Sequence, residues 1–125
     1  MKRFETGMFD VITITVNYKM REKALAMLRS LSRDVERSRL SVQPILVDNA
    51  SGDGIAGAIV REFTNVHPIP MVIAAPQNLG FGRGNNLGIR QADATYYFIV
   101  NPDIVFPPKA RVIERLYEFM EANPE

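Results

Sequence analysis

Four short runs of apolar residues divide the chain. They occupy residues 11–16, 45–47, 71–75 and 96–100, and they are rich in valine, isoleucine and aromatic residues. The runs are mostly continuous and do not alternate with polar residues, which is typical of strands buried on both faces, as in a parallel sheet. The pattern therefore predicts four short, buried strands.

Segments with a helical spacing of apolar residues lie between and after these runs. The first helix is expected from Arg21 to Glu36, and the second follows Asp53 or Ser51, either of which can cap it. A third is expected over 85–92, and a fourth after Pro108. The residues expected to face inward in the first, second and fourth helices are Leu25, Leu28, Leu31, Val35, Ile55, Ile59, Phe63, Ala110, Ile113, Tyr117 and Met120.

Strands and helices alternate along the whole chain. This order predicts an α/β fold with an open, mostly parallel, Rossmann-like sheet, right-handed crossovers and helices on both faces. The 125 residues fit one domain with a core of ordinary size. With 46% hydrophobic and 23% charged residues, the composition is that of a globular protein.

Charge and cysteine content exclude several classes of function. The net charge of +1, with lysine and arginine scattered, gives no reason to expect a nucleic-acid partner. The absence of cysteine excludes disulfides and thiolate metal sites and fits a cytoplasmic protein. Residues 1–10 lack the apolar core of a signal peptide, and the apolar runs are too short to span a bilayer. Any membrane contact is expected to be peripheral, at the inner face.

Polar residues follow each predicted strand at the point where it ends. They are Asn17–Tyr18, residues 48–51, Gln77–Asn78 and Asn101–Asp103. Carboxyl ends of parallel strands meet at one edge of a sheet, where ligands of open α/β folds bind. Each cluster alone is explained by a turn or a helix cap, but the four together predict a binding site.

The segment from residue 78 to residue 92 is rich in glycine. Its glycines are Gly80, Gly82, Gly84 and Gly88, and such residues allow a backbone to approach a phosphate closely. The segment does not follow the first strand, and no Walker lysine is present, so neither common nucleotide-binding fingerprint applies.

Taken in order, these segments resemble the amino-terminal half of family 2 glycosyltransferases of the GT-A fold, rhamnosyltransferase-like members in particular. The matching segments cover nearly the whole chain at the usual spacing of the family. They are ITVNYK, ILVDNASGDG, NLGFGRGNNLGIRQA, YYFIVNPDIVFPP and LYEFMEANPE. The resemblance implies an inverting transfer of a sugar, such as rhamnose, in cell-wall or surface polysaccharide synthesis.

The resemblance also implies roles for individual residues. The tyrosine of the first loop would lie near the base, and Asp48 would accept the N–H of a pyrimidine ring. Many relatives carry arginine at the position of Asn85. The nucleotide-sugar-binding residues that it implies are Asn17, Tyr18, Asp48, Asn49, Gly80, Asn85 and Asn101.

Asn101–Pro102–Asp103 matches the DXD motif of the family, whose last acid binds a divalent metal that bridges the diphosphate of the donor. This implies Mg²⁺ or Mn²⁺ as a cofactor, with Asp103 as its ligand. Such ions keep several waters, need only one or two carboxylates, and neutralise the charge of a departing nucleoside diphosphate. Asn101 replaces the first acid of the usual motif, which removes one charge.

The partners implied are a dTDP- or UDP-sugar and a glycan or lipid-linked acceptor. An inverting transferase also needs a general base for the acceptor hydroxyl. The acids that follow Asp103 do not match the base motif of the family; they are Glu114, Glu118, Glu121 and Glu125. We therefore expect residues 1–125 to form one domain, the donor-binding part of a longer catalytic domain, that lacks a base and self-associates through uncovered apolar surface.

Two other classes of function fit the same pattern. A non-catalytic nucleotide-binding module would keep the donor cleft without transfer. A flavodoxin-like or other Rossmann-type domain would resemble the family by convergence of its strand-end loops. Metal-dependent binding of a nucleoside diphosphate would distinguish a glycosyltransferase or a non-catalytic nucleotide-binding module from a Rossmann-type domain that is similar only by convergence.

Overall fold

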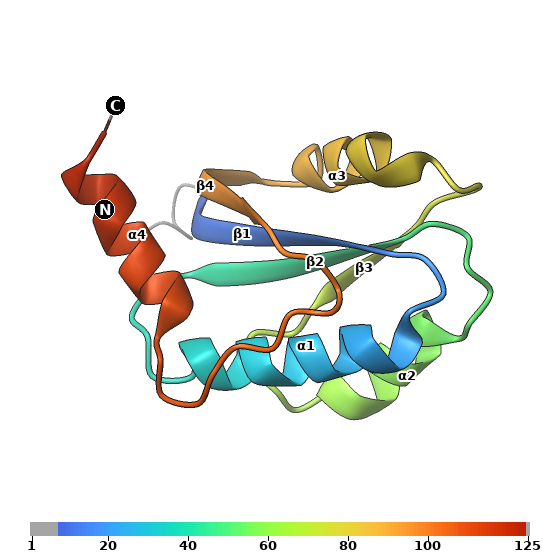
Figure 1. Ribbon diagram of the computed structural model, residues 1–125, viewed down its shortest axis with the longest axis horizontal. Helices are drawn as coiled ribbons and strands as arrows, with labels where there is room; N and C mark the ends of the chain where they lie inside the picture. Colours follow the sequence, from blue (N-terminus) through green and yellow to red (C-terminus); the bar gives the residue numbers. More distant parts are fainter. Residues whose placement is uncertain (1–7, 125) are drawn as a thin grey trace.

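The computed structural model describes residues 8–124, which form a four-stranded parallel sheet with four helices (Figure 1). The elements are β1 (Met8–Asn17), α1 (Arg21–Val35), β2 (Val42–Asp48), α2 (Ile55–Phe63), β3 (Met71–Ala74), α3 (Gly80–Ile89), β4 (Asp93–Ile99) and α4 (Val112–Ala122). The strand order is β3-β2-β1-β4, and each neighbouring pair is parallel. The predicted α/β fold with a parallel sheet is confirmed.

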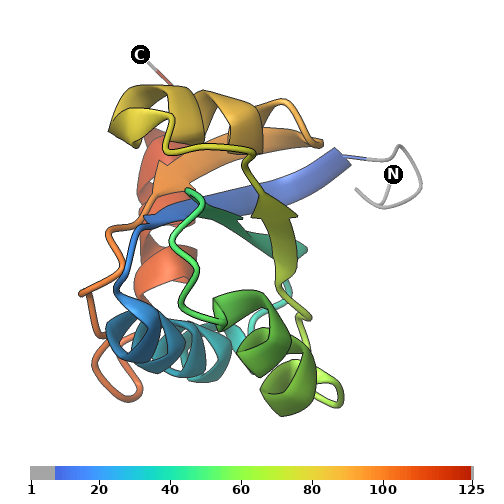
Figure 2. The ribbon, with the colours of Figure 1, turned by 90° about the vertical axis from the view of Figure 1, so that its right-hand side faces the viewer.

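Helices cover both faces of the sheet. α1 and α2 lie on one side and α3 on the other (Figure 2). Alternate residues of β1 point to the two faces of the sheet. Ile12 and Ile14 belong to the apolar cluster that includes Leu87 of α3, whereas Val11 belongs to the cluster that includes residues of α1 and α2. Burial on both faces explains why the apolar runs of the central strands are continuous.

The outer strands are more exposed than predicted. Nearly every residue of β1 and β2 is buried, whereas the residues of β3 and β4 are half-buried or exposed. The prediction of strands buried on both faces is therefore wrong for the outer pair. The physical reason is that the helices pack over the middle of the sheet, as α3 does by contacting mainly β1 and β2.

The third helix begins at Gly80, not at Asn85 as predicted. Its glycines allow it to lie close to the sheet. A Cβ atom at Gly88 would lie 2.9 Å from Cγ2 of Ile14, and one at Gly84 would lie 3.1 Å from Cγ2 of Val16. Packing thus stabilises a helix in a segment whose glycines have low helix propensity.

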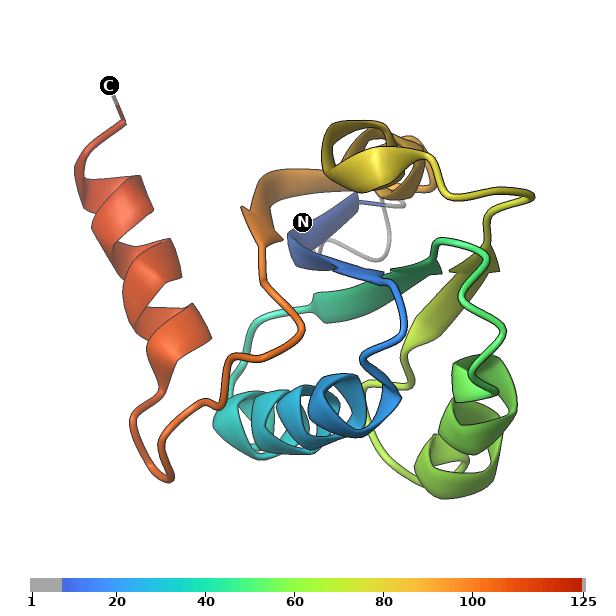
Figure 3. The same ribbon diagram turned by 45° about the vertical axis from the view of Figure 1, so that its right-hand side comes forward.

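α4 lies at the end of the sheet where the strands begin, beside β4 (Figures 1 and 3). Ile113 is buried, and the ring of Tyr117 packs edge-on against Tyr96 of β4 at a centroid distance of 5.6 Å. Two predictions for the fourth helix are wrong: Ala110 precedes the helix, which begins at Val112, and the side chain of Met120 is 37% exposed. Within residues 8–124, no helix has the length and apolar character to cross a membrane.

Candidate functional site

The carboxyl ends of β1, β2 and β3 lie level at one edge of the sheet, which Figure 2 views end-on. The strand register pairs Asn17 with Asp48, and Asp48 with Ala74. β4 ends earlier: its last residue, Ile99, pairs with Ile14, and the N–H of Val100 donates to the carbonyl of Ile14 at 2.8 Å. The chain leaves β1 toward β2 and later returns to pair with its other side, so this edge contains the switch point at which open α/β sheets bind ligands.

Asn17 is fully buried and joins the first two strand-end loops. Its Nδ2 lies 3.1 Å from Oδ1 of Asp48, 3.2 Å from Oγ of Ser51 and 3.1 Å from Oδ2 of Asp53. Its Oδ1 accepts the N–H of Met20, just before α1, at 3.3 Å. One amide therefore fixes the β1–α1 loop against the β2–α2 loop.

Asp48 is half-buried, and one of its carboxylate oxygens is engaged. Oδ1 accepts hydrogen bonds from Asn17 and from the hydroxyl of Ser51. Oδ2 accepts none from the part of the chain that the structure describes. Since a carboxylate oxygen has two lone pairs, this one can accept an N–H from a ligand at the sheet edge.

Asp53 stabilises the start of α2 and has a shifted pKa. Its Oδ1 accepts the N–H of Ile55, the first residue of α2, at 3.2 Å. The N-cap position itself is Gly54, so the predicted cap by Asp53 or Ser51 is wrong: Asp53 contacts the helix from one residue before the cap. Burial alone would raise the pKa of Asp53, but hydrogen bonds from Asn17, Ser51 and the N–H of Ile55 outweigh it and lower the pKa below the ordinary 3.8. The carboxylate is therefore charged at neutral pH.

Asn49 is buried and joins the end of β2 to the start of α3. Its Nδ2 donates to the carbonyl of Gly80 at 3.1 Å, and its Oδ1 accepts the N–H of Leu79 at 3.4 Å. Gly80 has a φ of 81°, a left-handed conformation that glycine adopts without strain. The glycine-rich segment is thereby fixed to the same edge of the sheet.

Asn85 lies within α3 and is 6% exposed. Its Nδ2 donates to the carbonyl of Phe81 at 3.0 Å. Its Oδ1 is buried and accepts no hydrogen bond from residues 8–124. Because buried polar atoms are usually paired, this oxygen is available to a donor group.

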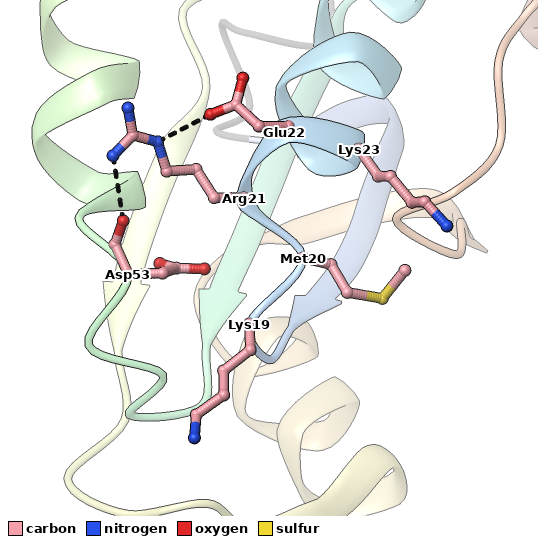
Figure 4. Close-up of a pocket in the computed structure, with 6 residues that line it drawn as sticks. All are labelled: Lys19, Met20, Arg21, Glu22, Lys23 and Asp53. Carbon is pink, nitrogen blue, oxygen red and sulfur yellow. Dashed lines mark hydrogen bonds and ion pairs between the residues drawn. The ribbon is translucent and has the colours of Figure 1, made fainter.

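Basic residues surround a cavity of about 500 Å³ beside this cluster (Figure 4). The cavity is lined by Lys19, Met20, Arg21, Glu22, Lys23 and Asp53. Arg21 donates through Nη1 to the carbonyl of Asp53 at 3.2 Å, and its Nε lies 3.0 Å from Oε2 of Glu22. The ammonium groups of Lys19 and Lys23 pair with no carboxylate among the described residues.

These cations were not predicted as site residues, because they do not form a continuous basic run in the sequence. The available signal was a basic residue at every second position directly after the first strand, at residues 19, 21 and 23. Tyr18, which was predicted, is 43% exposed at the same loop, and Nζ of Lys19 lies 5.2 Å from the centroid of its ring.

The segment after β4 forms a separate part of the site. Asn101 and Asp103 are exposed, and the N–H of Ile104 donates to the carbonyl of Asn101 at 3.2 Å, which closes a turn with Pro102 and Asp103 at its centre. Neither polar side chain makes a hydrogen bond to another described residue. The structure therefore does not join them to the Asn17 cluster.

A divalent cation at this turn would rely on Asp103. Among residues 8–124, no group of three or more His, Cys, Asp or Glu side chains is arranged to hold a metal. A single exposed carboxylate without a partner suits Mg²⁺ or Mn²⁺, which keep several waters and share the phosphate oxygens of a ligand. The residues therefore fit a cation held jointly with a diphosphate and do not fit a site made by the protein alone.

Comparison with known proteins identifies the family. The profile of glycosyl transferase family 2 matches residues 10–125. The chain belongs to this family. No curated protein sequence matches it.

The fold of the chain is similar to that of two solved structures. S. aureus TarS 1-349 in complex with UDP is 20% identical with a TM-score of 0.76, over 92% of this chain and 33% of that one. The mannosyltransferase PcManGT from Pyrobaculum calidifontis, in complex with GDP-Man and Mn²⁺, is 21% identical with a TM-score of 0.72, over 88% of this chain and 32% of that one. The likeness confirms the predicted GT-A fold, and the chain spans about a third of the length of these structures.

Proposed function

We propose that this family 2 chain is the donor-binding part of an inverting glycosyltransferase that uses a nucleotide-diphosphate sugar. The observation that carries the proposal is the free Oδ2 of Asp48, held at the carboxyl edge of β2 by the hydrogen bonds of Asn17 and Ser51 to the other oxygen. Family membership supports it, as do the nucleotides named in the complexes of TarS and PcManGT.

The base is recognised by Asp48 and Tyr18. Oδ2 of Asp48 accepts the ring N–H of uracil or thymine, while the exposed ring of Tyr18 offers a face for stacking. Adenine presents a bare acceptor at the matching edge. A bound adenine would cover Oδ2 of Asp48 without donating to it, and leaving a polar group buried and unpaired costs about 1–3 kcal/mol, so the site favours pyrimidines.

The diphosphate lies between the basic loop and the turn after β4. A bound divalent cation supplies positive charge against the diphosphate as the sugar departs. Asp103 would hold this cation together with waters, and the unpaired ammonium groups of Lys19 and Lys23 would attract the same phosphates. Oδ1 of Asn85 offers an acceptor to a donor hydroxyl.

The donor that we propose is dTDP-rhamnose or a UDP-sugar, and the acceptor is a glycan or lipid-linked saccharide in cell-wall or surface polysaccharide synthesis. The choice of rhamnose rests on the resemblance of the five segments named in the sequence analysis, taken together in order, to rhamnosyltransferase-like proteins.

Calorimetric titration with UDP and ADP, with and without Mn²⁺, tests the proposal. We expect UDP to bind about ten- to a hundredfold more tightly than ADP, which corresponds to the cost of an unpaired buried group. We expect Mn²⁺ to strengthen UDP binding in the wild type and to have no effect in Asp103→Ala. Asn101→Asp should strengthen metal binding by restoring a charge.

Asp93→Ala, at an exposed carboxylate at the start of β4, is the matched control and should behave like the wild type. Equal affinity for UDP and ADP would mean that Asp48 has only a structural role in its loop. Metal-dependent UDP binding that persists in Asp103→Ala would rule out the metal assignment.

A further inference from the structure

The turn that carries Asp103 is held between two buried anchors. On one side, Val100 is 5% exposed and its N–H donates to the carbonyl of Ile14 in β1. On the other side, Phe106 is 7% exposed, and its ring belongs to the core cluster of α1. Residues 101–105 between them are exposed or half-buried. Asp103 therefore lies on a short loop with two fixed ends.

Ser30 of α1 forms the polar part of the second anchor. The N–H of Phe106 donates to Oγ of Ser30 at 2.9 Å. Ser30 is 1% exposed, and its hydroxyl donates to the carbonyl of Met27 at 2.8 Å, which leaves a lone pair for the Phe106 amide. Because a buried N–H needs an acceptor, this contact fixes where the chain after the turn meets α1.

We propose that Ser30 is a positioning residue for Asp103. By accepting the N–H of Phe106, it holds the Asp103 turn in the place where the carboxylate can share a cation with a bound diphosphate. This inference rests on the proposed function. Without the Ser30 hydroxyl, the loop visits other positions, and the apparent affinity for the cation falls by the fraction of molecules in which the turn is in place.

A second contact between α1 and the same segment provides a control. The carboxylate of Asp34 accepts the N–H of Val112 at 2.8 Å and that of Ile113 at 3.0 Å, at the start of α4. Asp34→Asn keeps only one acceptor oxygen and weakens this contact. Along the chain, Phe106 lies between Asp103 and the residues that Asp34 contacts. If any loosening of this segment from α1 weakened cation binding, both Asp34→Asn and Ser30→Ala would show it. If the Phe106 anchor positions the Asp103 turn, only Ser30→Ala would show it.

The experiment measures the affinity for UDP by calorimetry, once with MnCl₂ and once with EDTA. The proteins are the wild type, Ser30→Ala, Asp34→Asn, Asp103→Ala and Ser32→Ala. Ser32 is a half-buried serine of α1 whose hydroxyl makes no hydrogen bond to the described residues. In Ser30→Ala we expect the increase in UDP affinity caused by Mn²⁺ to be about three- to tenfold smaller than in the wild type. This is the effect expected if the Asp103 turn is in place in only about a third to a tenth of the molecules. Its affinity in EDTA, and both affinities of Ser32→Ala and Asp34→Asn, should match the wild type.

An unchanged gain in Ser30→Ala, or an equal loss in EDTA, would overturn the inference while leaving the proposed function intact. If Mn²⁺ does not increase the UDP affinity of the wild type, or still increases it in Asp103→Ala, the metal site itself is refuted, and the inference with it. If Ser30→Ala does not fold, hydrogen exchange of the wild type decides. The Phe106 amide should exchange far more slowly than that of Val105 and slow further with Mg²⁺ and UDP; exchange as fast as that of Val105 would overturn the proposal.

Discussion

A single buried side chain, that of Asn17, organises most of the candidate site. Its amide lies 3.1 Å from an oxygen of Asp48 and 3.1 Å from an oxygen of Asp53. Donors that favour the charged form of a carboxyl lower its pKa, and for Asp53 they outweigh the opposite effect of burial. Asn17 therefore acts electrostatically as well as by joining two loops.

The lowered pKa of Asp53 predicts how the stability of the fold depends on pH. A carboxyl whose pKa is lowered by folding stabilises the fold above its ordinary value, here 3.8, and that contribution is lost as the pH falls through the lower, folded value. We expect Asp53→Asn to be less stable than the wild type at pH 7, and the difference to shrink below pH 3.8 as wild-type Asp53 becomes protonated. Urea unfolding between neutral and acidic pH measures it.

Asp93→Asn, which removes an exposed carboxylate at the start of β4, is the control and should remain close to the wild type throughout. A gap between Asp53→Asn and the wild type that stays constant into strong acid would show that the side chain stabilises the fold by shape, not by charge.

The sequence predicted Asp48 as a site residue and Asp53 near the start of the second helix, but not that Asn17 contacts both. These residues are 31 and 36 positions from Asn17. Their meeting depends on the strand register, which pairs Asn17 with Asp48, and a single sequence does not specify that register. The link between them therefore became visible only in the structure.

Among the elements, α3 differs most from the sequence prediction. Strand and helix existence followed from apolar periodicity, and the stripe of α1 is buried as predicted. The start of α3 did not follow from periodicity, because Gly84 and Gly88 contribute close contact with β1 in place of apolar side chains. Packing in space, which local propensity does not include, decided this boundary.

This close contact predicts opposite effects at two glycines of α3. A Cβ at Gly88 would lie 2.9 Å from Ile14 and 3.2 Å from Val47, both in the core, whereas one at Gly82 would meet nothing within 4 Å. Gly88→Ala should therefore destabilise the fold by about 1–3 kcal/mol through overpacking. Gly82→Ala should be neutral or stabilise it by up to about 1 kcal/mol, because alanine favours a helix. Thermal unfolding of the two variants compares them directly, and equal shifts would contradict the packing of α3 described above.

At the scale of the whole molecule, α4 and the candidate site lie at opposite ends of the sheet (Figure 1). Of the acids that follow Asp103, Glu114 pairs with Arg111 at 2.7 Å and Glu121 accepts from the hydroxyl of Tyr96 at 2.6 Å, both near α4. Glu118 is on the same helix, and Glu125 lies outside the described residues. The three described acids therefore lie on α4, at the other end of the sheet from the carboxyl edge.

We therefore expect the 125-residue chain by itself to bind a nucleotide sugar without transferring it. Positioning of the acceptor and general base catalysis are together worth many powers of ten, so turnover should fall below detection. The measurement is glycoside formation from UDP- and dTDP-sugars with Mn²⁺ and saccharide or lipid-linked acceptors. Acceptor-dependent product at ordinary enzyme rates would show that a residue on α4, or one from a second molecule, serves as the base.

The contacts of Asn17 limit how the site can be re-engineered. The β2–α2 loop cannot be exchanged independently of the rest of the site, because its residues 48, 51 and 53 all accept from the side-chain amide of Asn17, which belongs to β1. A loop grafted from a relative would have to bring acceptors at those positions, or arrive together with a new residue 17. Changes of base preference in such a scaffold are therefore coupled substitutions across two loops, and libraries that vary one loop alone would consist largely of proteins with an unpaired buried amide.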